Sequence, residues 1–213
     1  MRGGRSLRSV MWVWVILLGL APLPLQAQRG ASSIPPDKIF EAIGAKEGMT
    51  VCEIGAGNGD LTIAVAKIVG EKGRVLTSEL GDETLKTLRA AVAASGLAQI
   101  TVVDGDPMKT NFPDATCDAL FLRNVYHHFT DPRTMNKSIA LALKPGGRLA
   151  VIDFGPSGGK EGATPQARAA PGPNHGVTAD TIARELKDAA FEPVAQQVGE
   201  QRWFMVVVQK PKG

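Results

Sequence analysis

The amino-acid sequence predicts an α/β fold in which helices cover both faces of a doubly wound, mostly parallel β-sheet. Three observations across its 213 residues predict this fold. Short apolar runs alternate with segments whose apolar residues recur at helical spacing. Most of these runs are continuously apolar, as in parallel strands that are buried on both faces. The last two runs are joined by only four residues, Gly199–Arg202, which indicates an antiparallel hairpin.

The first elements can be assigned in chain order. Asp37 can cap a helix that runs to residue 44 and carries its apolar residues on one face. The run 50–54 is an apolar strand that ends in glycines. Residues 60–69 have helical spacing, and two glycines follow them as a helix end. Residues 74–80 are the second expected strand.

The same alternation continues through the middle of the chain. An alanine-rich helix is expected before Gly96, and the next helix is ended by the segment Lys144-Pro-Gly-Gly147. The expected elements in this stretch are a helix at 83–95, strands at 99–103 and 117–122, a helix at 131–143 and a strand at 148–154.

Residues 155–177 differ from the rest because they are rich in glycine and proline. A loop of about 20 residues is long enough to suggest a lid, and a surface excursion is the alternative interpretation. Thr178 can then cap a helix at 179–189. Residues 192–198 and 203–209 are the two strands of the final hairpin.

The first 27 residues have the pattern of a secretory signal. Three arginines precede the apolar run 10–20, and Leu25-Gln26-Ala27 fits a cleavage site before Gln28. The apolar stretch is shorter than the ~20 residues that span a bilayer. We therefore expect an exported protein, periplasmic or secreted, with a membrane-anchored leader or a buried N-terminal helix as the alternatives. The expected parts are a signal peptide at 1–27, a linker at 28–36 and a domain at 37–213.

The charge and the composition of the mature chain argue against several partners. The leader holds three of the 24 basic residues and no acid, so 21 basic and 21 acidic residues remain. Aromatic residues make up only 5% of the sequence. Without a basic surface or stacking aromatics, no nucleic-acid partner is expected, and a membrane is expected only through an uncleaved leader. Three histidines and two cysteines show no ligand spacing, so no metal is expected.

Cys52 and Cys117 both fall in expected buried strands. Export could oxidise them. Their offsets from the strand ends differ by about three residues, which would place the two Cα atoms beyond the reach of a disulfide. We therefore expect two buried free thiols.

The glycine-rich segment Val51-Cys-Glu-Ile-Gly-Ala-Gly-Asn-Gly-Asp-Leu-Thr62 is the strongest chemical signal. Its glycines allow a tight turn between a strand and a helix and a close approach to a ligand. A dinucleotide fingerprint requires a small residue where Asp60 stands. Glu53 is unhelpful to a pyrophosphate but suits a cation such as the amino group of a methionine moiety.

Two further acids follow the next two strands. Glu79 lies at the tip of the second strand, where a carboxylate can accept both hydroxyls of a ribose. Asp106 follows the third strand and can accept the amino group of an adenine. Alone, Glu79 could be a solvated acid and Asp106 a turn residue, but together they form a constellation with the glycine turn.

These motifs resemble the class I S-adenosylmethionine-dependent methyltransferases in order and spacing. The segment Leu143–Asp153 fits them too, and Asn124-Val-Tyr-His-His-Phe129 resembles the quinone-biosynthetic C-methyltransferases and their small-molecule relatives. The resemblance covers about residues 35–210. It implies a Rossmann-like sheet of seven strands, with one antiparallel strand supplied by the C-terminal hairpin, and S-adenosyl-L-methionine as the cofactor.

The resemblance also assigns roles to individual residues. The residues expected around the cofactor are Glu53, Gly55, Ala56, Gly57, Asn58, Glu79, Leu80, Asp106, Pro107, Arg123 and Asn124. His127 and His128 are candidate bases on the acceptor side, because histidine is the commonest general base. Tyr126 could position the acceptor, and His175 could act from the loop. A group of small predicted methyltransferases with signal peptides is also similar, but Gly176 stands where their histidine is often followed by an arginine.

Four functions are compatible with these residues to different degrees. A methyltransferase that acts on a small molecule accounts for all the motifs. A non-catalytic module that binds S-adenosylmethionine or S-adenosylhomocysteine would suit an exported protein, which meets little of a cytoplasmic cofactor. Asp60 and Glu53 argue against a nicotinamide-dependent oxidoreductase. A protein-carboxyl methyltransferase of the isoaspartate type shares only the cofactor motifs. The acceptor and the oligomeric state are not specified by the sequence.

Overall fold

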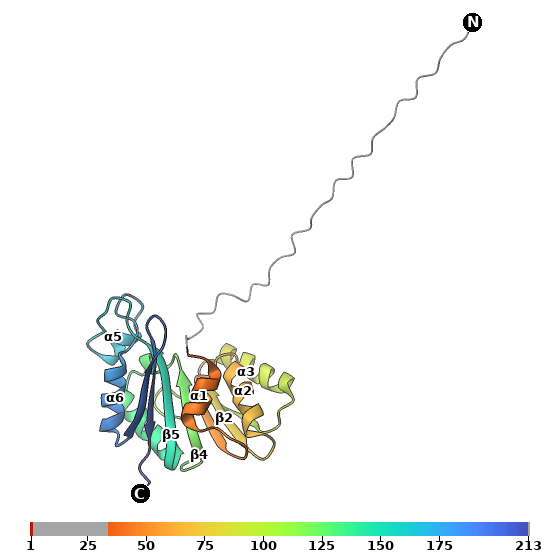
Figure 1. Ribbon diagram of the computed structural model, residues 1–213, viewed down its shortest axis with the longest axis horizontal. Helices are drawn as coiled ribbons and strands as arrows, with labels where there is room; N and C mark the ends of the chain where they lie inside the picture. Colours follow the sequence, from red (N-terminus) through yellow and green to blue (C-terminus); the bar gives the residue numbers. More distant parts are fainter. Residues whose placement is uncertain (2–33, 213) are drawn as a thin grey trace. The chain divides into compact units, whose positions relative to one another are not determined.

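The computed structural model describes residues 1 and 34–212 (Figure 1). The chain divides into two units, Met1–Gly30 and Ala31–Gly213, and all the helices and strands described below belong to the second. Apart from Met1, the predicted signal peptide lies outside the described residues. Within those residues, no helix combines the length and the apolar character that a membrane crossing requires.

Seven strands form one sheet in the order β3-β2-β1-β4-β5-β7-β6. Strands β1 to β5 are parallel, and β7 is antiparallel to both β5 and β6. This confirms the predicted mostly parallel sheet with one antiparallel strand from the C-terminal hairpin. The strands are β1 (Thr50–Ile54), β2 (Arg74–Glu79), β3 (Ile100–Asp104), β4 (Cys117–Arg123), β5 (Leu143–Phe154), β6 (Glu192–Val198) and β7 (Trp203–Gln209).

Helices pack on both faces of the sheet and produce two apolar cores (Figure 1). One core lies under α1 and α2 and also includes Leu97 and Ile100, which follow α3. The other core lies under α4 and α6. Alternate strand residues serve the two cores: Ala119 and Phe121 face the first, and Leu120 and Leu122 face the second. The helices are α1 (Pro36–Ile43), α2 (Asp60–Val69), α3 (Asp82–Ser95), α4 (Pro132–Ala142), α5 (Pro165–Ala169) and α6 (Ala179–Asp188), with a 3-10 turn η1 (Tyr126–His128).

Three segments differ from the sequence-based expectation. Helix α1 begins at Pro36 with Pro35 at the N-cap position, so Asp37 lies in its first turn and does not cap it. Strand β5 begins at Leu143 and not at Arg148, so it includes the Lys-Pro-Gly-Gly segment that was expected only to end the preceding helix. The register against β4 shifts between Cys117 and Ala119, and this irregularity lets the strand accommodate the extra residues. The predicted loop 155–177 contains the short helix α5, whose first turn is capped by the side chain of Thr164.

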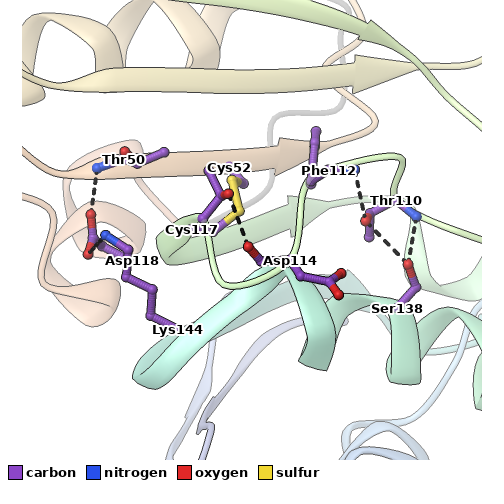
Figure 2. Close-up of a disulfide and its surroundings, with 10 residues drawn as sticks. Thr50, Cys52, Thr110, Phe112, Asp114, Cys117, Asp118, Ser138 and Lys144 are labelled. Carbon is purple, nitrogen blue, oxygen red and sulfur yellow. Dashed lines mark hydrogen bonds and ion pairs between the residues drawn. A yellow bond between two sulfur atoms is a disulfide. The ribbon is translucent and has the colours of Figure 1, made fainter.

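The expectation of free thiols is wrong, because Cys52 and Cys117 form a disulfide (Figure 2). Their Cα atoms are 5.8 Å apart. In a regular ladder, in which Cys52 pairs with Leu120, Cys117 would point to the opposite face of the sheet. The register shift after Cys117 returns its side chain to the face of Cys52, and both lie in the same buried core. The prediction failed because it assumed a strand without a bulge.

Candidate active site

A cavity of about 430 Å³ opens at the carboxyl ends of β1, β2, β3 and β4. In an open α/β sheet this is the position where the strand order reverses and ligands bind, and here the reversal lies between β1 and β4. The predicted cofactor-binding residues that line the cavity are Gly55, Ala56, Gly57, Asn58, Glu79, Leu80, Asp106, Pro107, Arg123 and Asn124.

The loop after β1 passes close to the segment after β4. Gly55 has φ +74°, and a Cβ atom at this position would lie 2.3 Å from Cγ2 of Val125. Gly57 also has a positive φ, of +56°, but no atom lies within 4 Å of the position that its Cβ would take. The first glycine is therefore required for space as well as for backbone conformation, and the second for conformation alone.

Glu79 joins the second strand to the glycine loop. Its carboxylate accepts a hydrogen bond from the backbone N–H of Gly57 at 2.5 Å and another from Leu80 at 2.7 Å. A carboxylate has about four acceptor positions, so Glu79 can still accept hydroxyl groups from a ligand. The predicted ribose-binding position is therefore at the cavity wall and already fixed in place by two backbone donors.

The other walls are set by the ends of β3 and β4. Asp106 accepts a hydrogen bond from the backbone N–H of Met108 at 2.8 Å. Asn124 has φ +62°, a left-handed conformation that asparagine tolerates better than most residues. Its N–H donates to the carbonyl of Ile152 on β5. This turn directs the chain from β4 across the cavity to the turn η1.

Glu53 does not line the cavity but lies beneath it, 3% exposed. Its carboxyl group accepts a hydrogen bond from the hydroxyl of Thr62 on α2. Burial raises the pKa of Glu53 to about 7, against the lowering effects of Thr62 and Arg123. The structure therefore places this residue between β1 and α2, one layer below the position expected for a direct ligand of an amino group.

The three candidate acceptor-side residues occupy different environments. His128 lines the cavity, whereas His127 and Tyr126 are buried behind it. Tyr126 donates its hydroxyl hydrogen to Glu185 of α6 at 3.0 Å and accepts one from Asn136 of α4 at 2.8 Å. Burial is the largest cause of a raised pKa for Tyr126. The tyrosine thus connects η1 to two helices and has no access to the cavity.

His127 forms a pair with an acid that the sequence reasoning missed. Its ring Nδ1 lies 2.8 Å from Oδ1 of Asp153, and its backbone N–H donates to the other carboxylate oxygen at 3.0 Å. Asp153 is the penultimate residue of β5 and is fully buried. An acid near the carboxyl end of a parallel strand is the signal that could have identified it. The cavity is also lined by Phe129, the last residue of the segment 124–129, and by Lys109 and Met135, which belong to no recognised motif.

The segment 155–177 brings His175 to the same place. The ring of His175 lies 4.6 Å from that of His127 and 5.8 Å from that of His128, measured between centroids. Its segment is held to the end of β5 by the N–H of Val177, which donates to Phe154. Arg168 of α5 is buried and pairs with Glu185 at 3.0 Å. The described residues hold no group of histidine, cysteine and acid side chains suited to a metal ion.

Comparison with known proteins identifies the family. Residues 32–158 match the model of the ubiE/COQ5 methyltransferase family. The chain is 35% identical over 116 residues to the ubiquinone/menaquinone biosynthesis C-methyltransferase UbiE of Azotobacter vinelandii. That match covers 54% of this chain and 46% of the relative, so the chain matches about half the length of this curated relative.

Solved structures share the fold over most of the chain. A SAM-dependent methyltransferase from Aquifex aeolicus is 26% identical, with a TM-score of 0.71, and the match covers 82% of this chain and 88% of that one. Phosphoethanolamine N-methyltransferase 2 from Haemonchus contortus, solved in complex with S-adenosyl-L-methionine, is similar in fold at 17% identity and a TM-score of 0.68, over 83% of this chain and 52% of that one. With the glycine loop, Glu79 and Asp106 around one cavity, these matches show that the chain belongs to the ubiE/COQ5 methyltransferase family and has the class I fold of S-adenosylmethionine-dependent methyltransferases.

Proposed function

We propose that this protein transfers a methyl group from S-adenosylmethionine to a small-molecule acceptor. The observation that carries the proposal is the cavity at the switch point of the sheet, where the glycine loop, Glu79 and Asp106 meet. Its volume is within the roughly 300–1,000 Å³ typical of ligand pockets. The family supports the same cofactor.

The residues present fit the cofactor. Glu79 would hold the ribose, because its carboxylate is fixed by the N–H groups of Gly57 and Leu80 and retains acceptor capacity. Asp106 would accept the amino group of the adenine, with Leu80 and Pro107 as apolar walls. Gly55 and its neighbours would hold the methionine moiety, where backbone can approach closely.

When bound, the cofactor supplies an electrophilic methyl carbon, and its sulfur keeps the C–S bonding pair as a neutral thioether. The protein contributes orientation and exclusion of water, which can account for a large part of the barrier in a displacement of this kind. Phe129, Met135 and Val125 supply an apolar wall for the acceptor next to His128. An acceptor that must lose a proton would find an imidazole at this wall.

The acceptor is best sought among hydroxylated aromatic rings. The apolar wall supports a ring of low polarity, and the curated relatives are named for C-methylation in ubiquinone and menaquinone biosynthesis. The chain and its relatives match over only about half of the relatives' length, so the acceptor of this protein needs its own assay.

The test is calorimetric titration of residues 28–213 with S-adenosylmethionine, S-adenosylhomocysteine and NAD, followed by methyl transfer to a panel of quinols, phenols and thiols. We expect micromolar binding of the two sulfur compounds, no binding of NAD, and turnover with at least one hydroxylated ring. Absence of binding by both sulfur compounds would contradict the proposal.

A second candidate is a module that binds the same cofactor or its product without turnover. The predicted export signal favours it, because S-adenosylmethionine is made in the cytoplasm. Micromolar affinity with no turnover on any acceptor of the panel, together with a stable protein partner, would select this function over the first.

We also infer that residues 1–27 direct export of the domain. The basic start and apolar run support this inference, and so does the Cys52–Cys117 disulfide, since disulfides persist in oxidising compartments. N-terminal sequencing of the protein recovered from cell fractions should find Gln28 as the first residue, outside the cytoplasm. A full-length chain in the membrane fraction would indicate an uncleaved anchor.

A further inference from the structure

All three histidines of the chain lie in one cluster, although His175 is far in sequence from His127 and His128. We call these residues the three-histidine cluster. The ring centroids of His127 and His128 are 3.9 Å apart, and His175 completes the group at 4.6 and 5.8 Å. One member, His128, lines the cavity, so the cluster connects the cavity to the protein interior.

The inner end of the cluster is an acid–imidazole pair. His127 and Asp153 are 1% and 0% exposed. The carboxylate of Asp153 accepts from the backbone N–H of His127 and of Phe154, at 3.0 and 2.8 Å, and contacts the ring Nδ1 of His127. Because a carboxylate only accepts, the proton of His127 resides on Nδ1, and this contact fixes the orientation of its ring.

The third member of the cluster, His175, has a buried polar atom without a hydrogen-bond partner among the described residues. This atom is Nδ1 of its ring. The backbone on either side of His175 is held: its own N–H donates to Gly172, and the N–H of Gly176 donates to Arg168. A Cβ on Gly176 would lie 2.7 Å from the carbonyl oxygen of Phe154, so a glycine is needed for this close approach. The fold thus places the ring of His175 against the other two.

We propose that Asp153 acts through His127 as a positioning residue for His128, which takes the proton that the methyl acceptor loses. This inference rests on the proposed methyl transfer. The acceptor's O–H or acidic C–H bond breaks, the proton joins a ring nitrogen of His128, and the electron pair stays on the acceptor as the nucleophile. The negative charge of Asp153 stabilises the imidazolium, and the proton passes to solvent after the product leaves. His175 packs against both rings from the segment 155–177.

The charges around His128 support this arrangement. Burial is the largest cause that lowers the pKa of His128, followed by His127 and His175, whereas Asp153 raises it. The lowered pKa keeps the ring able to accept a proton near neutral pH. The other charged groups on the cavity wall are Lys109, Arg123, Glu79 and Asp106, and Arg202 of the β6–β7 connection lies 5.1 Å from the ring of Phe154.

The first test needs neither the cofactor nor the acceptor. Untagged protein has three histidines, so the imidazole region of its proton NMR spectrum reports only on the cluster. Loss of a signal in His128→Asn assigns that residue. We expect Asp153→Asn to shift the His128 titration to lower pH, because a negative charge that favours the imidazolium is lost. Asp118→Asn is the matched control: its carboxylate also accepts a backbone N–H, from Thr50 at 2.7 Å, but lies at the opposite end of β4.

The second test measures the proton transfer itself. His128→Ala should lower kcat by about 10²–10⁴-fold with a small effect on KM, and added imidazole should restore part of kcat. If Asp153→Asn does not fold, His127→Asn is the second variant: it keeps the charge of Asp153 and removes the lowering effect of His127, so the His128 titration should move to higher pH. An unshifted His128 titration in these variants, or a kcat that imidazole does not restore, overturns the proposal. Failure of the methyl-transfer assay with a shifted titration would instead count against the proposed function alone.

Discussion

At the scale of single residues, Glu79 is the side chain with the most direct expected effect on the cofactor. Its carboxylate is shared between the glycine loop and the cavity. We expect Glu79→Ala to weaken binding of S-adenosylmethionine by about 10–100-fold, since hydrogen bonds to a charged group contribute about 1.5–3 kcal/mol. Calorimetry measures this loss, and Glu83→Ala, an exposed acid at the start of α3, is the control. Unchanged affinity in a folded Glu79→Ala protein would remove the ribose role.

Glu53 makes stability depend on pH. Its pKa is raised from 4.5 to about 7 because burial disfavours the carboxylate. Between these two pH values the folded state binds the proton and the unfolded state releases it, so stability falls as pH rises through this window. The full difference corresponds to roughly 3 kcal/mol at most, reached above pH 7.

Glu53→Gln should therefore gain stability relative to the wild type as pH rises. The amide keeps the shape of the side chain and can still accept from Thr62. Urea unfolding at pH 5 and pH 8 checks this, with Glu41→Gln on the exposed face of α1 as the control. An equal difference from wild type at both pH values would show that Glu53 does not change its protonation in this range.

At the scale of elements, the turn η1 separates a structural tyrosine from a cavity-lining histidine. Tyr126 bonds to Glu185 and Asn136 and so joins η1 to α4 and α6. Tyr126→Phe should lower the free energy of unfolding by about 1–2 kcal/mol, the cost of unsatisfied buried partners, and leave KM for the acceptor unchanged. Thermal unfolding and steady-state kinetics separate the two effects. A large rise in KM without loss of stability would restore the acceptor-positioning role predicted from the sequence.

The strands and helices with clear periodicity could be predicted from the sequence, because the apolar residues that each one buries recur at a spacing visible within that segment alone. Strand β2 and helix α2, for example, lie where the pattern placed them, apart from one terminal residue. Helix α5 could not be predicted in this way, since five residues carry no periodicity and its position depends on the buried Arg168–Glu185 pair. The early start of β5 depends on pairing with β4, which no local pattern records.

The residues of the candidate site also fall into those that could be predicted from the sequence and those that could not. Residues directly after a strand, such as Gly55, Glu79 and Asp106, could be placed at one edge because parallel strands end together. The depth of Glu53 and the burial of Tyr126 and His127 could not, because side-chain direction in a short turn depends on packing from distant elements. The Asp153–His127 contact joins residues 26 positions apart and was not visible before the fold.

At the scale of the whole molecule, the disulfide between Cys52 and Cys117 should stabilise the fold by lowering the conformational entropy of the unfolded chain. It closes a loop with a sequence separation of 65, for which the chain-entropy relation gives roughly 4 kcal/mol. The double variant Cys52→Ala and Cys117→Ala should lose about that much stability in denaturant unfolding. The same loss is expected for wild-type protein unfolded under reducing conditions. A loss in neither case would indicate that the two thiols are not joined in solution.

The disulfide also changes the covalent topology of the cavity edge. The ring that it closes contains the glycine loop, Glu79 and Asp106, whereas Arg123 and Asn124 lie outside it. A single proteolytic cut between residues 53 and 116 would open this ring without releasing a fragment, because the two pieces would remain linked through sulfur. A cut in the segment 155–177, by contrast, would leave α6 and the final hairpin attached only by noncovalent contacts, chiefly the ladder between β7 and β5.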